Sequence, residues 1–281
     1  MYKDMILIAD SGSTKTDWCV SAQGEQLQRI TTHGINPYFL SEDAIGKEIR
    51  SSLLPEIQTH TFDALYFYGA GCLPEKIPIM KSMLGKYLNV KTIEVNSDIL
   101  AAARGLSGRN PGIICIMGTG SNSCYYDGEK IVSNVSPLGF ILGDEGSGAV
   151  LGKLMVGDLL KNQLPEGLKE KFLQEFDLTP GMIIEQVYRQ PFPNRFLASL
   201  SPFLLRNIKE PAVRSLVFNS FLSFLTRNVK QYDYKNYPVY FIGSIAYYYR
   251  DILEDALISS GMQSGGIIQN PMEGLVKYHF N

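Results

Sequence analysis

Residues 6–18 read ILIADSGSTKTDW: an apolar run that stops at Asp10, a turn built from small residues, and then Lys15. The apolar run is typical of a buried strand, and residues 15–20 (KTDWCV) alternate polar and apolar side chains as a second strand does. After the turn SAQGEQ, residues 27–33 indicate a third strand. The small-residue turn therefore joins two antiparallel strands.

This turn can be interpreted in two ways. It can be a β-hairpin turn, in which Gly12 supplies a positive φ and Asp10 hydrogen-bonds locally. It can also be a phosphate site, in which backbone N–H groups converge on an anion while Asp10 holds Mg²⁺ through water. Two familiar phosphate loops are excluded, because only one glycine precedes Lys15 and because a strand rather than a helix follows the turn.

Composition limits the class of protein. The 281 residues suffice for one large or two ordinary domains, and 45% hydrophobic with 19% charged residues is typical of a folded soluble chain. A net charge of −2 gives no electrostatic footprint for nucleic acid or an anionic membrane. The apolar stretch before Asp10 is too short for a signal peptide, and no run approaches a membrane span. We therefore expect a cytoplasmic protein that binds neither nucleic acid nor membrane.

The cysteines and histidines form no metal-binding pattern. No C-x-x-C pair is present, and three of the four cysteines lie in apolar strand-like runs, so we expect them to be reduced and mostly buried. The cysteines are Cys19, Cys72, Cys115 and Cys124. The histidines, which likewise form no zinc-binding pattern, are His33, His60 and His279. Any catalysis must rest on carboxylates, hydroxyls, lysine and backbone groups.

After the first three strands the sequence alternates helix and strand. Helices are predicted at 41–54, 76–88 and 98–106, and strands at 63–68 and 91–95. Three antiparallel strands followed by α-β-α-β-α is the ribonuclease-H-like order, a mixed sheet covered by helices.

The same pattern restarts after SGRNPG, near residue 108. Residues 113–117 predict an apolar strand, GTGS follows as a second small-residue turn, and Asp127-Gly128 gives a hairpin signal before a strand at 130–135. We infer an α/β protein of two duplicated ribonuclease-H-like domains (βββαβαβα), each with one phosphate loop facing a nucleotide cleft.

The two turns, Ser11-Gly12-Ser13 and Thr119-Gly120-Ser121, are offset by 108 positions. Two loops of this kind are far less easily accidental than one, which favours the phosphate interpretation. We expect a first domain at 1–110 and a second at 111–270, with the C-terminal helix 271–281 packing back on the first.

The second half adds helices and a further turn. Helical patterns fill 147–162 and about 196–231, and their apolar positions indicate core packing. PVYFIGSIAYYYRDIL (238–253) is a strand that meets Gly243-Ser244 and at once begins a helix. Such a turn presents free N–H groups and lets a flat ring or phosphate approach the backbone, although ordinary strand-turn-helix packing is the alternative.

Four motifs together resemble the actin/hexokinase/Hsp70 ATPase superfamily. They are Asp10 with GSTKT (12–16), GTGS (118–121), GDEGSG (143–148) and GSIA (243–246). Within the superfamily the chain looks like the N-acetylglucosamine kinase branch of the BadF/BcrA-type ATPases. The similarity covers nearly the whole chain in order.

The resemblance implies an ATP- and Mg²⁺-dependent enzyme. Asp10 would orient Mg²⁺ through water, and positioning with charge neutralisation would do most of the catalytic work. Lys15 would touch phosphate, with a solvent-facing strand lysine as the alternative. The expected nucleotide contacts are Gly12, Ser13, Thr14, Lys15, Thr16, Gly118, Thr119, Gly120, Ser121, Gly243 and Ser244.

Asp98 follows a predicted strand and starts a predicted helix, in EVNSDILAAARG. By similarity it is the general base that accepts the sugar hydroxyl proton. The alternative is an N-cap, which Asn96 or Ser97 could equally supply.

The same resemblance assigns sugar contacts to carboxylate, amide and hydroxyl side chains, which fix sugar hydroxyls well. They are Asn36, Asp98, Thr119, Asn122 and Asp144. The alternatives are a turn before Pro37 for Asn36 and helix capping for Asp144.

One departure opens the question of sugar identity. Animal N-acetylglucosamine kinases carry Gly-Trp-Gly ahead of GDEGS, whereas this chain has Pro137-Leu138-Gly139. Leu138 supplies neither an aromatic face nor an indole donor. Glucosamine, N-acetylglucosamine and N-acetylmuramic acid therefore all stay as candidate substrates.

The resemblance thus predicts a kinase that phosphorylates the 6-hydroxyl of an amino sugar, and it implies a homodimer. Two alternatives stay open. One is an activator ATPase of a 2-hydroxyacyl-CoA dehydratase system, which needs cysteines from each subunit to hold an iron–sulfur cluster. The other is a sensor that binds sugar and nucleotide without turnover.

Overall fold

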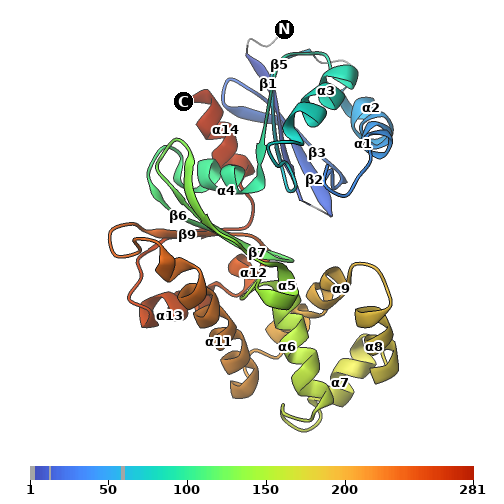
Figure 1. The fold of residues 1–281 in the computed structure, drawn as a ribbon, viewed down its shortest axis with the longest axis vertical. Coiled ribbons are helices and arrows are strands. Elements are labelled where there is room, and N and C mark those ends of the chain that lie inside the picture. Colours follow the sequence, from blue (N-terminus) through green and yellow to red (C-terminus); the bar gives the residue numbers. More distant parts are fainter. Residues whose placement is uncertain (1–3, 13, 58–60) are drawn as a thin grey trace. The chain divides into compact units, whose positions relative to one another are not determined.

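The computed structural model describes residues 4–12, 14–57 and 61–281, and these fall into two units (Figure 1). Each unit is built on a mixed five-stranded sheet with helices packed against it. The predicted α/β class with two such domains is confirmed. The first unit comprises the described residues up to Asn110, Gly128–Lys130 and Asn270–Asn281, and the second comprises Pro111–Asp127 and Ile131–Gln269.

In the first unit the strand order is β3-β2-β1-β4-β5. β1 pairs antiparallel with β2 and parallel with β4, and β4 pairs parallel with β5. The elements are β1 (Met5–Ser11), β2 (Lys15–Ala22), β3 (Glu25–His33), α1 (Glu42–Glu48), the π-helix η1 (Ile49–Leu53), α2 (Leu54–Ile57), β4 (Phe62–Gly69), α3 (Ile77–Tyr87), β5 (Val90–Ser97), α4 (Asp98–Ser107) and α14 (Met272–Phe280).

Helices cover both faces of this sheet (Figure 1). Along β1, Leu7 and Ala9 pack into one core with residues of α1, η1 and α3. Ile6 and Ile8 point the other way, into a core with α4 and α14. Asp10 continues the even-numbered series, so its side chain lies on the face that α4 covers.

The second unit repeats the arrangement, with strand order β8-β7-β6-β9-β10. Its strands therefore correspond one to one with those of the first unit, as expected for a duplication. The elements are β6 (Gly112–Met117), β7 (Ser121–Tyr126), β8 (Ile131–Val135), α5 (Gly139–Leu142), α6 (Gly148–Leu160), α7 (Leu168–Glu175), α8 (Pro180–Tyr188), α9 (Pro193–Leu200), α10 (Pro202–Arg206), α11 (Pro211–Arg227), the 3₁₀ helix η2 (Val229–Gln231), β9 (Val239–Ile242), α12 (Ser244–Tyr248), α13 (Arg250–Ser259) and β10 (Ser264–Ile268).

Two segments predicted as helical are divided into shorter helices. The segment predicted as one helix at 41–54 contains a π-helical stretch, η1, between α1 and α2. The segment predicted as helical at 196–231 is interrupted, because Pro202 and Pro211 begin new helices. Proline lacks a backbone N–H and is tolerated in the first turn of a helix but not inside one.

The strand pairing aligns the two small-residue turns differently from the constant offset of 108 positions. The strand pair Ser11–Thr16 closes the first turn, and the pair Met117–Ser121 closes the second. The second turn is thus one residue shorter. Counted from the strand ends, Gly12 corresponds to Gly118 rather than to Gly120.

A polar network connects α14 to the sheet of the first unit. Arg104 Nη1 donates hydrogen bonds to Tyr68 Oη (2.8 Å) and Glu94 Oε1 (2.9 Å). Tyr68 Oη in turn lies 2.8 Å from His279 Nε2, and the His279 ring stacks on Tyr66 at a centroid distance of 3.6 Å. Burial, with Arg104 nearby, lowers the pKa of His279 to about 4.

We expect His279→Gln to change how stability depends on pH. The folded state holds His279 neutral, so only the unfolded chain takes up a proton as the pH falls below about 6.5, and this favours unfolding until about pH 4. The variant should therefore lose about 1–2 kcal/mol less free energy of unfolding than the wild type between pH 7 and pH 5. Urea denaturation at a series of pH values measures this.

The exposed His33 of β3 supplies the matched control, His33→Gln. Because this side chain is exposed, the variant reports any effect of the histidine-to-glutamine change that does not come from burial. Equal slopes for His279→Gln and the wild type would show that the pKa of His279 is the same in the folded and unfolded chain, which would contradict the prediction.

Candidate active site

Asp10 and Asp98 lie at one edge of the first sheet. The register places Asp10 opposite Tyr68 on β4, and Tyr68 opposite Asn96 on β5. β5 ends at Ser97 and α4 begins at Asp98. Because the carboxyl ends of parallel strands share an edge, the two carboxylates come within electrostatic reach of each other.

Both carboxylates are partly buried, and the pKa of each is raised. Burial, with the neighbouring carboxylates of Asp98 and Asp17, raises the pKa of Asp10 to about 7, while Lys15 opposes the shift. Burial also raises the pKa of Asp98, against the hydrogen bond that Ile99 N donates to Asp98 Oδ1 (2.8 Å).

The Asp10 carboxylate accepts no hydrogen bond from the described residues. Among the charges that act on Asp10, only Lys15 is positive, whereas the carboxylates of Asp98 and Asp17 add negative charge nearby. The described carboxylates form no group that could ligate a metal ion directly, but the Asp10 oxygens suit a divalent cation held through its water ligands. The residues present thus fit the predicted magnesium ion.

The turn after β1 is held by its own backbone. Gly12 N donates to Lys15 O (2.9 Å), and Gly34 N donates to Thr14 O (3.0 Å). The Lys15 ammonium is exposed and pairs with Asp17 Oδ2 at 2.6 Å. Ser13 lies outside the described residues.

The Thr16 side chain forms hydrogen bonds inside the turn. Its side chain is fully buried, and its hydroxyl lies 2.6 Å from Ser11 Oγ and donates to His33 O (3.1 Å). Ser11 Oγ also donates to Ile35 O, at 3.0 Å. These bonds connect the ends of β1, β2 and β3 to the segment that carries Asn36.

Asn36 is buried and anchors a turn. Its Oδ1 accepts a hydrogen bond from Tyr38 N (3.0 Å), and its carbonyl accepts from Leu40 N (2.9 Å). Gly71 packs directly against it, since a Cβ at that position would lie 2.0 Å from Asn36 Oδ1. The turn-forming alternative for Asn36 is therefore realised in the structure.

In the second unit, two turns meet at one end of the sheet. Gly118 N donates to Gly120 O (2.9 Å), and Gly118 O accepts from Gly148 N at the start of α6 (2.8 Å). Gly243 has φ = +117°, and a Cβ there would lie 2.3 Å from Met117 O. Only glycine permits this approach. The Gly118–Gly120 turn and the exposed Ser244 thus lie side by side.

Asp144 lies over the same turn. Its Oδ1 accepts a hydrogen bond from Ser121 N (3.3 Å), and its Oδ2 lies 3.1 Å from where a Cβ of Gly120 would be. Burial raises the pKa of this carboxylate, and the nearby Glu145 contributes. Asp144 has φ = +52°, and its carbonyl accepts from Ser147 N (3.0 Å), so the backbone of this loop is fixed.

Thr119 and Asn122 differ in their surroundings. Thr119 is exposed, whereas the Asn122 Oδ1 accepts hydrogen bonds from Ser123 N and Asn134 Nδ2, both at 2.9 Å. The Asn122 side chain is therefore already bound to the neighbouring strand, β8.

The predicted site residues thus form two groups, each within its own unit. One gathers at the sheet edge of Asp10 and Asp98, and the other gathers around the Gly118–Gly120 turn. The first group holds Asp10, Gly12, Thr14, Lys15, Thr16, Asn36 and Asp98, and the second holds Gly118, Thr119, Gly120, Ser121, Asn122, Asp144, Gly243 and Ser244.

Sequence reasoning missed two supporting residues. Asp17 lies opposite Asp10 on β2 and contributes to its raised pKa. Its position seven residues after Asp10, in an alternating strand, was the available signal. Gly71 leaves room for Asn36, and the signal was GAG at 69–71 after a strand.

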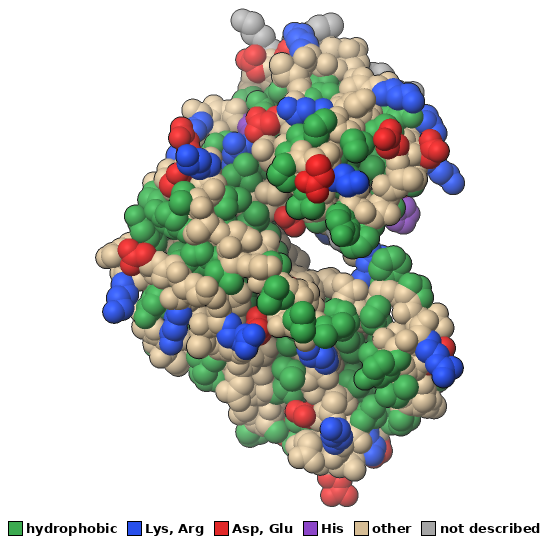
Figure 2. Space-filling view, viewed as in Figure 1, with side chains coloured by type: hydrophobic (Ala, Val, Ile, Leu, Met, Phe, Trp, Pro, Cys, Tyr) green, Lys and Arg blue, Asp and Glu red, His purple; other side chains and the backbone are tan. Residues whose placement is uncertain are grey.

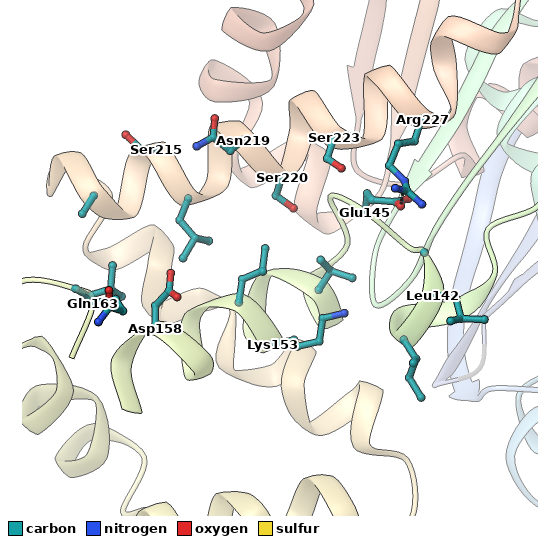
Figure 3. Close-up of a pocket in the computed structure, with 17 residues that line it drawn as sticks. Leu142, Glu145, Lys153, Asp158, Gln163, Ser215, Asn219, Ser220, Ser223 and Arg227 are labelled. Carbon is teal, nitrogen blue, oxygen red and sulfur yellow. Dashed lines mark ion pairs between the residues drawn. The ribbon is translucent and has the colours of Figure 1, made fainter. Parts of the chain in front are cut away.

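A pocket of about 580 Å³ opens in the second unit between α6 and α11, beside α5 (Figure 3). Glu145 and Arg227 form an ion pair at 2.5 Å at one end of it, and Asp158 lies toward the other (Figure 3). Lys153, which also lines it, donates to Phe140 O. None of the predicted site residues lines this pocket, although Gly143 and Glu145, on either side of Asp144, do.

The cysteines and the possible metal-binding groups of the described residues suggest no second reactive site. All four cysteines are free and buried, as predicted, and burial raises the pKa of Cys72 to about 12. Among these residues, no group of three or more histidine, cysteine or acidic side chains could hold a metal ion.

No helix in the described ranges has the length and apolar character to cross a bilayer. Figure 2 shows acidic and basic side chains scattered over the face in view.

Comparisons with known proteins place the chain among sugar kinases. No protein-family model matches it. A proposed N-acetylglucosamine kinase of Porphyromonas gingivalis is 54% identical, with a TM-score of 0.97 over 99% of both chains. A second, from Chromobacterium violaceum, is 18% identical over 98% of both chains, with a TM-score of 0.76, and shares the fold.

The N-acetyl-D-glucosamine kinase of Dictyostelium discoideum is 27% identical over 192 residues. The alignment spans 62% of this chain and 60% of that protein, so it covers less than two thirds of the curated relative.

The fold and its acidic strand edge define the class of protein, an ATPase of the actin/hexokinase/Hsp70 superfamily. Within that superfamily the chain belongs to the N-acetylglucosamine kinase family of sugar kinases, whose members use ATP.

Proposed function

We propose that the protein transfers the γ-phosphoryl group of Mg-ATP to the 6-hydroxyl of N-acetylglucosamine or a closely related amino sugar. The observation that carries the proposal is the pair Asp10 and Asp98, two partly buried carboxylates at one strand edge, with the pKa of each raised. The names of the relatives from Porphyromonas gingivalis and Dictyostelium discoideum support the choice of sugar.

Mg-ATP, when bound, supplies the phosphoryl group and a divalent charge beside it. Asp10 would hold the hydrated ion, because its carboxylate is free of hydrogen bonds from the described residues. Backbone N–H groups of the two turns would bind the phosphates. These contacts are proposed for Gly12, Ser13, Thr14, Lys15, Thr16, Gly118, Thr119, Gly120 and Ser121, with Gly243 and Ser244 against the rest of the nucleotide.

Asp98 would accept the proton of the attacking hydroxyl. Its Oδ1 accepts a hydrogen bond from the amide of Ile99, which restricts the orientation of the carboxylate. Burial raises the pKa of Asp98, which makes its carboxylate a stronger base for accepting the hydroxyl proton.

The sugar would be positioned by Asn36, Thr119, Asn122 and Asp144. Among these, the Asp144 carboxylate has a raised pKa and a fixed backbone, as a group that orients a substrate hydroxyl requires. Leu138 occupies the position at which the animal enzymes carry tryptophan. Its aliphatic side chain is 58% exposed.

ADP release by the purified protein tests the proposal, with N-acetylglucosamine, glucosamine, N-acetylmuramic acid, N-acetylmannosamine and glucose as acceptors. We expect turnover that requires both a sugar and Mg²⁺, is fastest with an N-acetylated amino sugar, and stops with EDTA. Phosphorus NMR of the product identifies the hydroxyl. Hydrolysis that is indifferent to every sugar would contradict the proposal and favour an activator or sensor role.

A further inference from the structure

The turn that Asn36 anchors presents two aromatic side chains to solvent. Tyr38 is 61% exposed and Phe39 is 67% exposed, and their rings pack edge to face with a centroid distance of 5.0 Å. Single exposed apolar side chains are ordinary, but adjacent exposed aromatic rings mark a binding surface more often.

The rings are held in place from below. Asn36 Oδ1 accepts from Tyr38 N, and the Asn36 carbonyl accepts from Phe39 N at 3.1 Å. Gly71, with φ = +75°, packs against both Asn36 and Tyr38, since a Cβ there would lie 3.0 Å from Tyr38 Cβ. Exposed rings on a fixed backbone lose little conformational entropy when they bind.

The turn lies at the sheet edge that carries the two catalytic-site carboxylates. Ile35, just before Asn36, exchanges hydrogen bonds with Ser11 Oγ at the end of β1. Ser11 O accepts from Ala70 N (2.8 Å), and the preceding residue, Gly69, lies opposite Ser97. Asp98 follows directly. All of these residues belong to the first unit.

We propose that Tyr38 and Phe39 cover the apolar C–H face of the acceptor sugar ring. A pyranose has a polar rim of hydroxyls and an apolar face, so its site needs a flat apolar surface next to the groups that bind hydroxyls. The first unit places two rings on the same edge as Asp98, and because they are set edge to face, one ring can lie flat on the sugar while the other closes its side. This inference rests on the proposed function.

The test uses Tyr38→Ala, Phe39→Ala and the double variant in the full-length protein. Losing one ring contact should raise KM for the sugar about 10- to 100-fold. The values of kcat and of KM for ATP should stay within about twofold, because the contact is made in ground and transition states alike. Tyr38→Phe and Phe39→Tyr keep a ring and should retain the sugar KM.

Tyr188 in α8, which is 77% exposed in the second unit, provides the matched control Tyr188→Ala. Its sugar KM should equal that of the wild type. An unchanged sugar KM in the double variant, while the wild type turns over, would overturn the inference and leave the proposed function intact. A loss of kcat together with a changed KM for ATP would show that the rings stabilise the folded site rather than contact the sugar, which would contradict the inference. Absence of sugar-dependent turnover in the wild type would overturn both proposals.

Discussion

Asp98→Asn should lower kcat by about 10²- to 10⁴-fold, which is the usual contribution of a general base. Asparagine keeps an oxygen for the hydrogen bond from Ile99 N, so the side chain should stay in place. Its amide, however, takes no proton from a hydroxyl at neutral pH. The values of KM for sugar and ATP should therefore change little, because the lost interaction develops only in the transition state.

Steady-state ADP release with saturating sugar measures this effect. Asp43→Asn is the matched control, because Asp43 also lies in the first turn of a helix, α1, but is exposed. That control should behave as the wild type. A kcat for Asp98→Asn within tenfold of the wild-type value would assign proton acceptance to another group.

Removing the Asp98 charge should also shift the titration of Asp10. The Asp98 carboxylate is the second cause, after burial, of the raised Asp10 pKa. The pKa of Asp10 in Asp98→Asn should therefore fall below about 7. A ¹³C NMR titration of labelled aspartate side chains reports this change independently of activity.

Gly274→Ala should destabilise the first unit by about 1–3 kcal/mol, as overpacking in a close-packed interior usually does. The helices α4 and α14 cross at Gly105 and Gly274, where a Cβ on Gly274 would lie 1.8 Å from Gly105 O. Backbone cannot rotate away as a side chain can, so the helices have to separate. Because α4 begins at Asp98, the same change should also lower kcat.

Gly157→Ala provides a control of the opposite sign. Gly157 lies inside α6, and a Cβ added there would meet no atom within 4 Å, so alanine adds helix propensity without a clash. It should stabilise the protein by up to about 1 kcal/mol. Thermal unfolding of both variants measures the contrast. A midpoint for Gly274→Ala at or above that of the wild type would show that the helices separate without loss.

Local patterns in the sequence were sufficient to predict most strands and both small-residue turns. The alternation in KTDWCV and the apolar run before Asp10 depend on residues close together in the chain. The segment at about 196–231 is helical as predicted, but it is divided into several helices because Pro202 and Pro211 each begin a new one.

The sequence by itself determined the order of strands and helices from β1 to α4, the position of Asp10 at a strand end, and the position of Asp98 at a helix start. Only the tertiary structure decided that these two carboxylates share an edge and raise the pKa of Asp10, that Thr16 is buried, and that the rings of Tyr38 and Phe39 stay exposed. The physical reason is separation: burial and charge coupling depend on residues brought together by packing across β1, β4 and β5, and no local pattern records that distance.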